Sequence, residues 1–266
     1  MSTELTQENK EYLIAQIEKY IGVRPFFYLK FCSKEKYAQD VCEGRFFANT
    51  ADFFRKQEIE NGERGQGDKN ELLLSIRPQK ISMYDIETGE LIATSYCGRA
   101  NIRFNEDGNI PLVSFVGIPL RDMILVKADE THAEFSLPFT DDEYNTMVKK
   151  FGAYCVILDA RELEEHIAHI CQNENCDYIF NAVQYCCGNR IDRMQAFANC
   201  DKRRFLYKDE DLSYQREYRL AVCKKMPDDH LISLGKMENA RILSPESLKN
   251  LRFSIEYVSE VKENAK

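Results

Sequence analysis

The stretch between Leu72 and Val126 constrains the fold most, because three strand-like segments follow one another there without an intervening helix. The turn sequences ETGE and NEDGN separate these segments, and Asp107-Gly108 is typical of a hairpin turn. Strands that adjoin in this way pair antiparallel, whereas parallel strands need a long crossover between them. The sequence therefore predicts an α+β fold with mixed, mostly antiparallel sheets and flanking helices, and it argues against a doubly wound fold.

Helical patterns lie on both sides of this β-rich stretch. A first helix is expected at about residues 6–21, where apolar residues recur at helical spacing and Gly22 ends the pattern. Residues 51–71 are expected as a polar connection. Helical patterns predominate again at about 140–200, which we interpret as a helical insertion. The 266 residues contain no evident hinge, so we expect a single α+β domain over 1–266.

Charge and hydropathy limit the functions that we expect for this chain. The net charge of −8 argues against broad binding to nucleic-acid backbones, which needs basic patches. One short basic cluster, Asp201–Lys208, is expected to be solvated. No apolar run approaches the ~20 residues of a membrane helix, and the polar N-terminus does not resemble a secretory signal. We therefore expect a soluble, cytoplasmic protein without a membrane partner.

Ten cysteines raise the question of metal binding. In a cytosolic chain, cysteines are reduced thiols, metal ligands or redox groups. The densest cluster runs from His166 to Cys187. Its candidate zinc ligands are His169, Cys171, Cys176 and Cys186. Zinc sites usually show two tight C-x2-C pairs, and this cluster shows neither, so we expect no metal and leave this cluster open.

The segment Tyr214–Arg219 concentrates the side chains best suited to chemistry. On an extended strand, Gln215, Glu217 and Arg219 share one face. A carboxylate in such a place stabilises the oxocarbenium-like centre that forms when a glycosidic bond breaks. The alternative is an edge strand in which Glu217 pairs with Arg219 or with a neighbouring strand, a contact of ~0.2–1 kcal/mol. Common nucleotide-loop, zinc-protease and serine-hydrolase motifs are absent from the sequence.

Two further segments suggest a family. Residues 26–56 read as strand, helix and strand, and they contain the sequence FFANTADFF. Together with Gln215-Arg216-Glu217, this arrangement resembles the ADP-ribosyltransferase superfamily over about residues 26–56 and 205–222. The resemblance implies an NAD-dependent ADP-ribosyltransferase or NAD glycohydrolase, with Glu217 as the catalytic glutamate and Gln215 as the residue two before it. It implies a small nucleotide, NAD, as substrate and a protein or nucleic-acid acceptor.

The resemblance also implies where NAD would bind. The implied NAD-contacting residues are Tyr28, Lys30, Asn49, Thr50, Phe53, Phe54 and Arg55. Asn49 and Thr50 would lie beside the nicotinamide, and Phe53 or Phe54 would stack on it. The first strand lacks the usual Arg or His, although Lys30 could neutralise a diphosphate. The alternative is therefore a non-catalytic nucleotide-binding or protein-interaction module on the same fold.

The chain also resembles a group of bacterial and phage domains that share a GD-x-x-E … E-x-R arrangement, which implies a toxin or phage-defence role. Here Gly67-Asp68 and Glu71 supply the first motif and Glu217-x-Arg219 the second. Asp68 and Glu71 would hold a substrate or close as a lid. The alternative for this glycine-rich loop is a solvated, flexible connector. A Mg²⁺-dependent nuclease that uses its acids is a third and weaker hypothesis.

Overall fold

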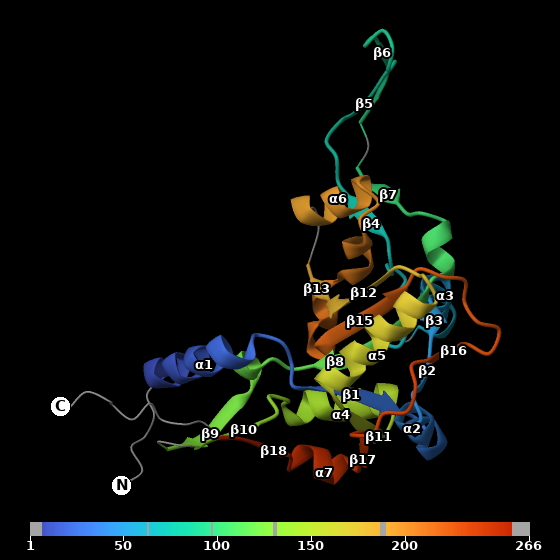
Figure 1. The fold of residues 1–266 in the computed structure, drawn as a ribbon. Coiled ribbons are helices and arrows are strands. Elements are labelled where there is room, and N and C mark those ends of the chain that lie inside the picture. Colours follow the sequence, from blue (N-terminus) through green and yellow to red (C-terminus); the bar gives the residue numbers. More distant parts are fainter. Residues whose placement is uncertain (1–6, 63, 97, 130–131, 187–189, 257–266) are drawn as a thin grey trace. The chain divides into compact units, whose positions relative to one another are not determined.

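The computed structural model describes residues 7–62, 64–96, 98–129, 132–186 and 190–256 of the chain (Figure 1). It contains helices and mostly antiparallel sheets, which confirms the predicted α+β class. The chain divides into two compact units. Unit 1 is Met1–Arg45, Phe115–Ile167 and Leu234–Lys266, and unit 2 is Phe46–Ser114 and Ala168–Ser233. The expected single domain over 1–266 stays a prediction, and each unit is described by itself.

Unit 1 is built around the strand that follows α1 (Gln7–Ile21) in the sequence. Strand β1 (Phe27–Cys32) pairs antiparallel with β8 (Pro111–Gly117) and, along its whole length, with β11 (Tyr154–Asp159). Strand β17 (Arg241–Leu243) continues this sheet beyond β11. A second sheet has the order β18 (Arg252–Glu256), β10 (His132–Ser136), β9 (Ile124–Ala128). The helices are α1 (Gln7–Ile21), α2 (Glu35–Cys42), α4 (Asp141–Phe151) and α7 (Pro245–Lys249).

Unit 2 contains the strand that carries Glu217. Strand β15 (Glu217–Val222) lies between β12 (Tyr178–Ala182) and β8, so it is a central strand and not the edge strand of the alternative interpretation. Strand β3 (Asn49–Thr50) also pairs with β8, which passes into unit 1 after Ser114. The core beneath these strands is formed by Ala51, Leu72, Leu112, Phe205 and Ala221.

Short helices and strand pairs complete unit 2. The helices are α3 (Ala51–Asn61), α6 (Ile191–Ala198) and the C-terminal part of α5 (Ala160–Asn173). The antiparallel pairs are β4 (Leu74–Ile76) with β7 (Ala100–Ile102), β5 (Ile81–Tyr84) with β6 (Leu91–Ser95), and β2 (Arg45–Phe47) with β16 (Leu231–Ser233). One small pair is parallel, β13 (Gln184–Tyr185) with β14 (Tyr207–Lys208). Within unit 2, β5 and β6 form a ribbon that extends away from β4 and β7 (Figure 1).

In the β-rich stretch, one predicted turn is confirmed and another is wrong. The turn at ETGE joins β5 and β6 as a hairpin. The predicted hairpin at Asp107-Gly108 is wrong, because these residues form a 3-10 helix, η1 (Glu106–Asn109), between strands that do not pair with each other. Arg204 holds the Asp107 carboxylate with two hydrogen bonds of 2.6 and 2.7 Å, which draws this acid into the interior.

One predicted helix agrees with the structure, and another helix forms where none was predicted. Helix α1 agrees with the expected 6–21, although residue 6 lies outside the described residues. The polar connection expected from residue 51 is wrong for its first half, which forms α3. Thr50 caps this helix by accepting a hydrogen bond from the Phe53 amide at 3.2 Å, and Gly62 ends it with φ 68°.

The stretch interpreted as a helical insertion contributes strands as well as helices. It contains α4, the whole of α5, and α6, as expected. It also contains β11 and β12, which pair with β1 and β15 respectively. Among the described residues, no helix combines the length and apolar character that crossing a membrane requires.

Candidate functional site

The segment before β15 is not extended. Gln215 ends a 3-10 helix, η4 (Glu210–Gln215), and Arg216 follows in the left-handed region with φ 45°. The prediction that Tyr214–Arg219 forms one strand is therefore wrong for its first half. The side chains of Gln215 and Glu217 nevertheless lie beside one another. Both bind the Lys208 ammonium, Gln215 through Oε1 at 3.0 Å and Glu217 through Oε2 at 2.6 Å.

The Glu217 carboxylate is fully enclosed, with 3% of the residue exposed. Its Oε1 accepts from Ser114 Oγ at 2.6 Å and from Arg219 Nε at 2.8 Å, and its Oε2 accepts from Lys208. Burial alone raises the pKa of Glu217, but the charges of Arg219 and Lys208 outweigh burial and hold that pKa well below its ordinary value. Glu217 is therefore an ionised carboxylate at neutral pH.

Arg219 joins the two motifs that the sequence places almost 150 residues apart. Its guanidinium binds both carboxylate oxygens of Glu71 at 2.6 and 3.1 Å, and it also donates to the Phe205 carbonyl at 2.8 Å. The side chains of Arg219 and Glu71 are each 1% exposed. Bidentate pairing with further hydrogen bonds is the geometry that compensates two charges for loss of water.

Lys208, Glu217, Arg219 and Glu71 form one buried network of ion pairs. A glycine allows the loop after α3 to reach this network. A Cβ on Gly67 would lie 2.3 Å from the Glu58 amide nitrogen and 2.8 Å from the Phe54 carbonyl oxygen. The next residue, Asp68, donates its amide to the same Phe54 carbonyl at 3.0 Å. The loop therefore packs directly on α3, and Asp68 and Glu71 are buried rather than solvated. The flexible-connector interpretation is wrong for these two acids.

Gly67→Ala should consequently destabilise unit 2. The added methyl group meets backbone atoms that cannot rotate away, so we expect a loss of about 1–3 kcal/mol in the free energy of unfolding. Gly98→Ala is the matched control, because a Cβ there meets no atom within 4 Å. Urea titration of both variants measures the difference. Equal stability of the two variants would contradict the close approach at Gly67.

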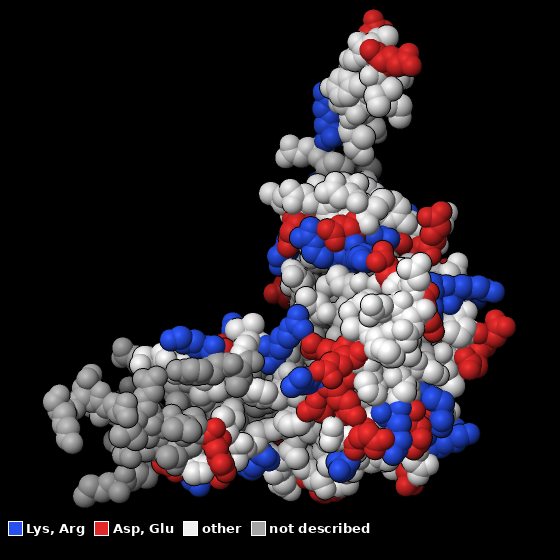
Figure 2. Space-filling model, in the orientation of Figure 1, with Lys and Arg blue, Asp and Glu red and all other residues white. Residues whose placement is uncertain are grey.

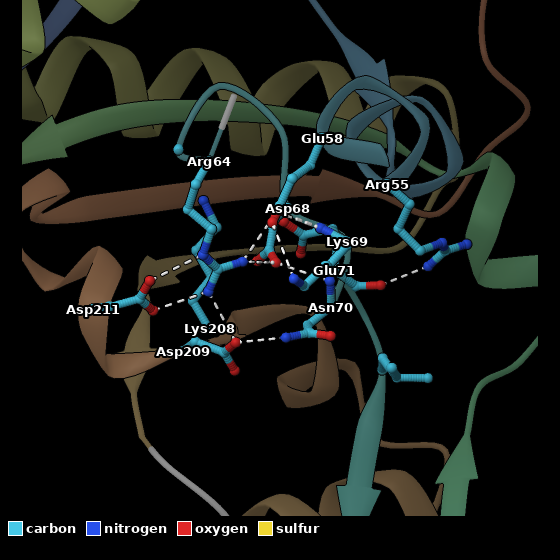
Figure 3. Close-up of polar contacts among 12 residues, drawn as sticks. Arg55, Glu58, Arg64, Asp68, Lys69, Asn70, Glu71, Lys208, Asp209 and Asp211 are labelled. Carbon is cyan, nitrogen blue, oxygen red and sulfur yellow. Dashed lines mark hydrogen bonds and ion pairs between the residues drawn. The ribbon is translucent and has the colours of Figure 1, made fainter. Parts of the chain in front are cut away.

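Arg64 connects the interior network to the surface (Figure 3). Its Nη1 donates to Asp68 at 2.8 Å and to Glu58 at 3.1 Å, while its Nη2 donates to Asp209 and to Asp211, each at 2.9 Å. Asp68 is almost completely buried, but the side chain of Asp211 is 59% exposed. Arg64 thus bridges the buried Asp68 and the exposed Asp211.

Asp68 is a buried carboxylic acid whose pKa is raised. Burial, reinforced by the charge of Glu71, raises its pKa to about 6, while Lys208 opposes this shift. Asp68 and Glu217 therefore have pKa values displaced in opposite directions within one network. Such divergence is what separates a proton-transferring carboxyl group from a permanently charged one in acid–base sites.

The predicted NAD-contacting residues of unit 2 have mixed roles. Asn49 lies opposite Leu112 in the sheet, and the Thr50 hydroxyl caps α3. Phe53 is 44% exposed, whereas Phe54 packs against the core of unit 2.

Arg55 is the predicted contact that reaches the network. It donates to the Glu71 carbonyl at 2.5 Å and also pairs with Asp52. Arg55 therefore supports the backbone of the residue that binds Arg219.

The other two predicted NAD contacts lie in unit 1. Tyr28 is 1% exposed and donates its hydroxyl to Glu164 Oε1 at 2.8 Å. The Lys30 ammonium lies 5.4 Å from the centre of the Phe115 ring, a cation–π contact. The part of these residues in NAD binding stays a prediction.

The candidate zinc ligands do not converge. Cys186 packs with Ala196 and Tyr207, and His169 Nε2 lies 3.0 Å from the Asn173 amide nitrogen. Cys171 and Cys176 instead line a cavity of about 870 Å³. In the part of the chain that the structure describes, no three such side chains are arranged to hold a metal ion, and Cys187 lies outside that part.

Sequence reasoning missed three residues of the network. Lys208 was expected to be solvated with its basic neighbours, but it is 7% exposed. Ser114 and Tyr185 were not singled out, although Ser114 binds the Glu217 side chain and the Tyr185 hydroxyl accepts from the Glu217 amide at 2.9 Å. The run Phe205–Tyr207 that precedes Lys208 was the one signal that this lysine faces the interior.

Comparisons with known proteins add no assignment to this geometry. The chain matches no protein-family model, no curated protein and no solved structure. The resemblance to ADP-ribosyltransferases therefore stays a prediction.

Proposed function

We propose that the chain is an enzyme that cleaves the nicotinamide–ribose bond of NAD, as an ADP-ribosyltransferase or NAD glycohydrolase. The observation that carries the proposal is the pair of carboxylates, Glu217 and Asp68, in one buried network with pKa values displaced in opposite directions. Carboxylates with strongly perturbed pKa values cluster at functional sites, which supports the proposal. A toxin or phage-defence role belongs to this proposal through the resemblance alone.

The roles follow from the charge of each group. Cleavage leaves positive charge on the ribosyl carbon as nicotinamide departs with the bonding electrons. Glu217 is held ionised and stabilises that charge, while Gln215 shares Lys208 with it and orients the acceptor. Asp68 takes the proton from the acceptor hydroxyl or water. Arg219, Lys208 and Glu71 act as positioning residues, because they fix the Glu217 carboxylate.

Asp68 makes the proposal sensitive to pH. A general base must be ionised, so NAD cleavage should rise with pH and reach half its plateau near the pKa of about 6. Asp68→Asn should lower the plateau about 100-fold or more, because it removes the base. Asp142→Asn, on the exposed start of α4, is the matched control. A rate that is independent of pH between 5 and 8, or an Asp68→Asn variant as active as the control, would contradict this role.

The burial of Glu217 favours a second candidate, a non-catalytic nucleotide-binding or protein-interaction module. Both carboxylate oxygens are occupied by Ser114, Arg219 and Lys208, which is also what a purely structural acid requires. Calorimetry with NAD, followed by chromatography of the same sample, separates the two candidates. Saturable binding with release of nicotinamide supports the enzyme, saturable binding without release supports a nucleotide-binding module, and no binding supports a protein-interaction module.

A further inference from the structure

The hairpin of β5 and β6 presents an unusual amount of apolar surface. We call residues 80–96 the ribbon. Its large exposed apolar side chains are Ile81, Met83, Tyr84, Ile86, Leu91, Ile92 and Tyr96. Ile86 at the turn is 99% exposed and Ile92 is 61% exposed. So many large exposed apolar side chains on one short segment are typical of an interaction site.

The outer strand edges of the ribbon also lack a neighbouring strand in the part of the chain that the structure describes. In the described parts of the chain, β5 and β6 pair only with each other. An isolated two-stranded hairpin is marginally stable in water, and an open strand edge offers unpaired amides and carbonyls to another strand. The turn itself is well formed, because Asp85 Oδ1 accepts from the amides of Glu87 and Thr88 at 2.9 and 2.7 Å. The ribbon is therefore a defined surface that needs a partner.

The charges on the ribbon indicate which partner fits. Its turn carries three acids, Asp85, Glu87 and Glu90, whereas its root carries Lys80 with Arg77 and Arg99 beside it. Acidic side chains are visible at the end of the ribbon and basic ones near its root (Figure 2). An acidic end disfavours nucleic acid and anionic lipid. Two ribbons placed antiparallel would bring each acidic turn against the other's basic root.

We propose that the ribbon is a dimerisation element that pairs antiparallel, edge to edge, with the ribbon of a second copy of this chain. The interface of such a pair is isologous. The same strand edge of each copy therefore pairs its open backbone amides and carbonyls with those of the other copy. The pairing closes an exposed edge, buries apolar side chains from both copies and joins opposite charges twice. The ribbon shares no residue with the ion network, so dimerisation and NAD cleavage are separable properties.

Sedimentation velocity of the full chain tests this proposal. The wild-type chain should sediment as a dimer, and Ile92→Lys should weaken the dimer at least about tenfold by placing a charge in the interface. Ile59→Lys is the matched control, because Ile59 is 71% exposed on α3, outside the ribbon. A monomeric wild-type chain, or equal weakening by both substitutions, would overturn the proposal.

Charge exchange distinguishes a second copy from any other partner. In a pair formed through β6, Arg99→Glu and Glu90→Lys should each weaken the dimer about tenfold, because each sets like charges against one another across the two-fold axis. The double variant restores opposite charges and should recover dimerisation. These substitutions are on exposed side chains, so the circular dichroism spectrum, which reports the fold of each chain, should be unchanged. A double variant as weak as the sum of the two single ones would contradict the antiparallel arrangement.

Discussion

Arg219→Met should reduce the free energy of unfolding by about 3–5 kcal/mol. The substitution retains much of the side-chain volume but removes the cation that lies between Glu71 and Glu217. Both carboxylates are buried, so they would lose their strongest compensating charge where solvent screens their charges little. Urea-induced unfolding measured by circular dichroism gives the change directly.

The matched control is Arg203→Met. Arg203 also binds a carboxylate, that of Asp201 at 2.7 Å, but its side chain is 63% exposed. An exposed ion pair of this kind contributes about 0–1 kcal/mol. If Arg219→Met cost no more than Arg203→Met, the buried network would not have the energetic role that its geometry implies.

Glu217→Gln should lower the rate of NAD cleavage about 100- to 1000-fold. Glutamine occupies the same volume but carries no charge, so the ribosyl cation would lose its stabilising carboxylate. We expect the variant to keep its fold. The structure adds a cost of ~2 kcal/mol, because Lys208 and Arg219 lose a hydrogen-bonded anion. The rate must therefore be measured below the unfolding temperature of the variant.

The control for this experiment is Glu165→Gln on the exposed face of α5, where the side chain is 63% exposed. The two variants make the same chemical change in different surroundings. Loss of activity in Glu217→Gln alone, while the variant remains folded, supports a catalytic carboxylate. Unchanged turnover in a folded Glu217→Gln variant would assign Glu217 to a structural role and favour the non-catalytic module.

Strand β1 could be predicted because a short run of strand-forming residues is a local signal, although its burial does not alternate. It lies within residues 26–56, which read as strand, helix and strand, and it pairs along its full length with β11, a strand inside the stretch expected as a helical insertion. Helix α3 was missed because its buried positions include Arg55 and Glu58, which look solvated in the sequence. Those positions are buried only because Glu71, Arg64 and the loop after α3 fold against them.

The candidate site shows the same limit. The i, i+2 spacing correctly placed Glu217 beside Arg219, and Gln215 also reaches the network although its backbone is not extended. Lys208 was missed because the burial of a lysine depends on acids that surround it in space. No local pattern reports that Arg219 binds Glu71 across 148 positions. Only the paired GD-x-x-E and E-x-R motifs indicated that these segments act together.

The most direct test is to incubate the purified wild-type chain with NAD and to quantify free nicotinamide by chromatography. The proposed function predicts that nicotinamide accumulates catalytically and that its rate of release rises through pH 6 as Asp68 ionises. Water serves as an acceptor in this assay, and candidate protein or nucleic-acid acceptors can be added separately. Saturable NAD binding without any release of nicotinamide, at every pH and with every acceptor, would contradict the enzymatic account.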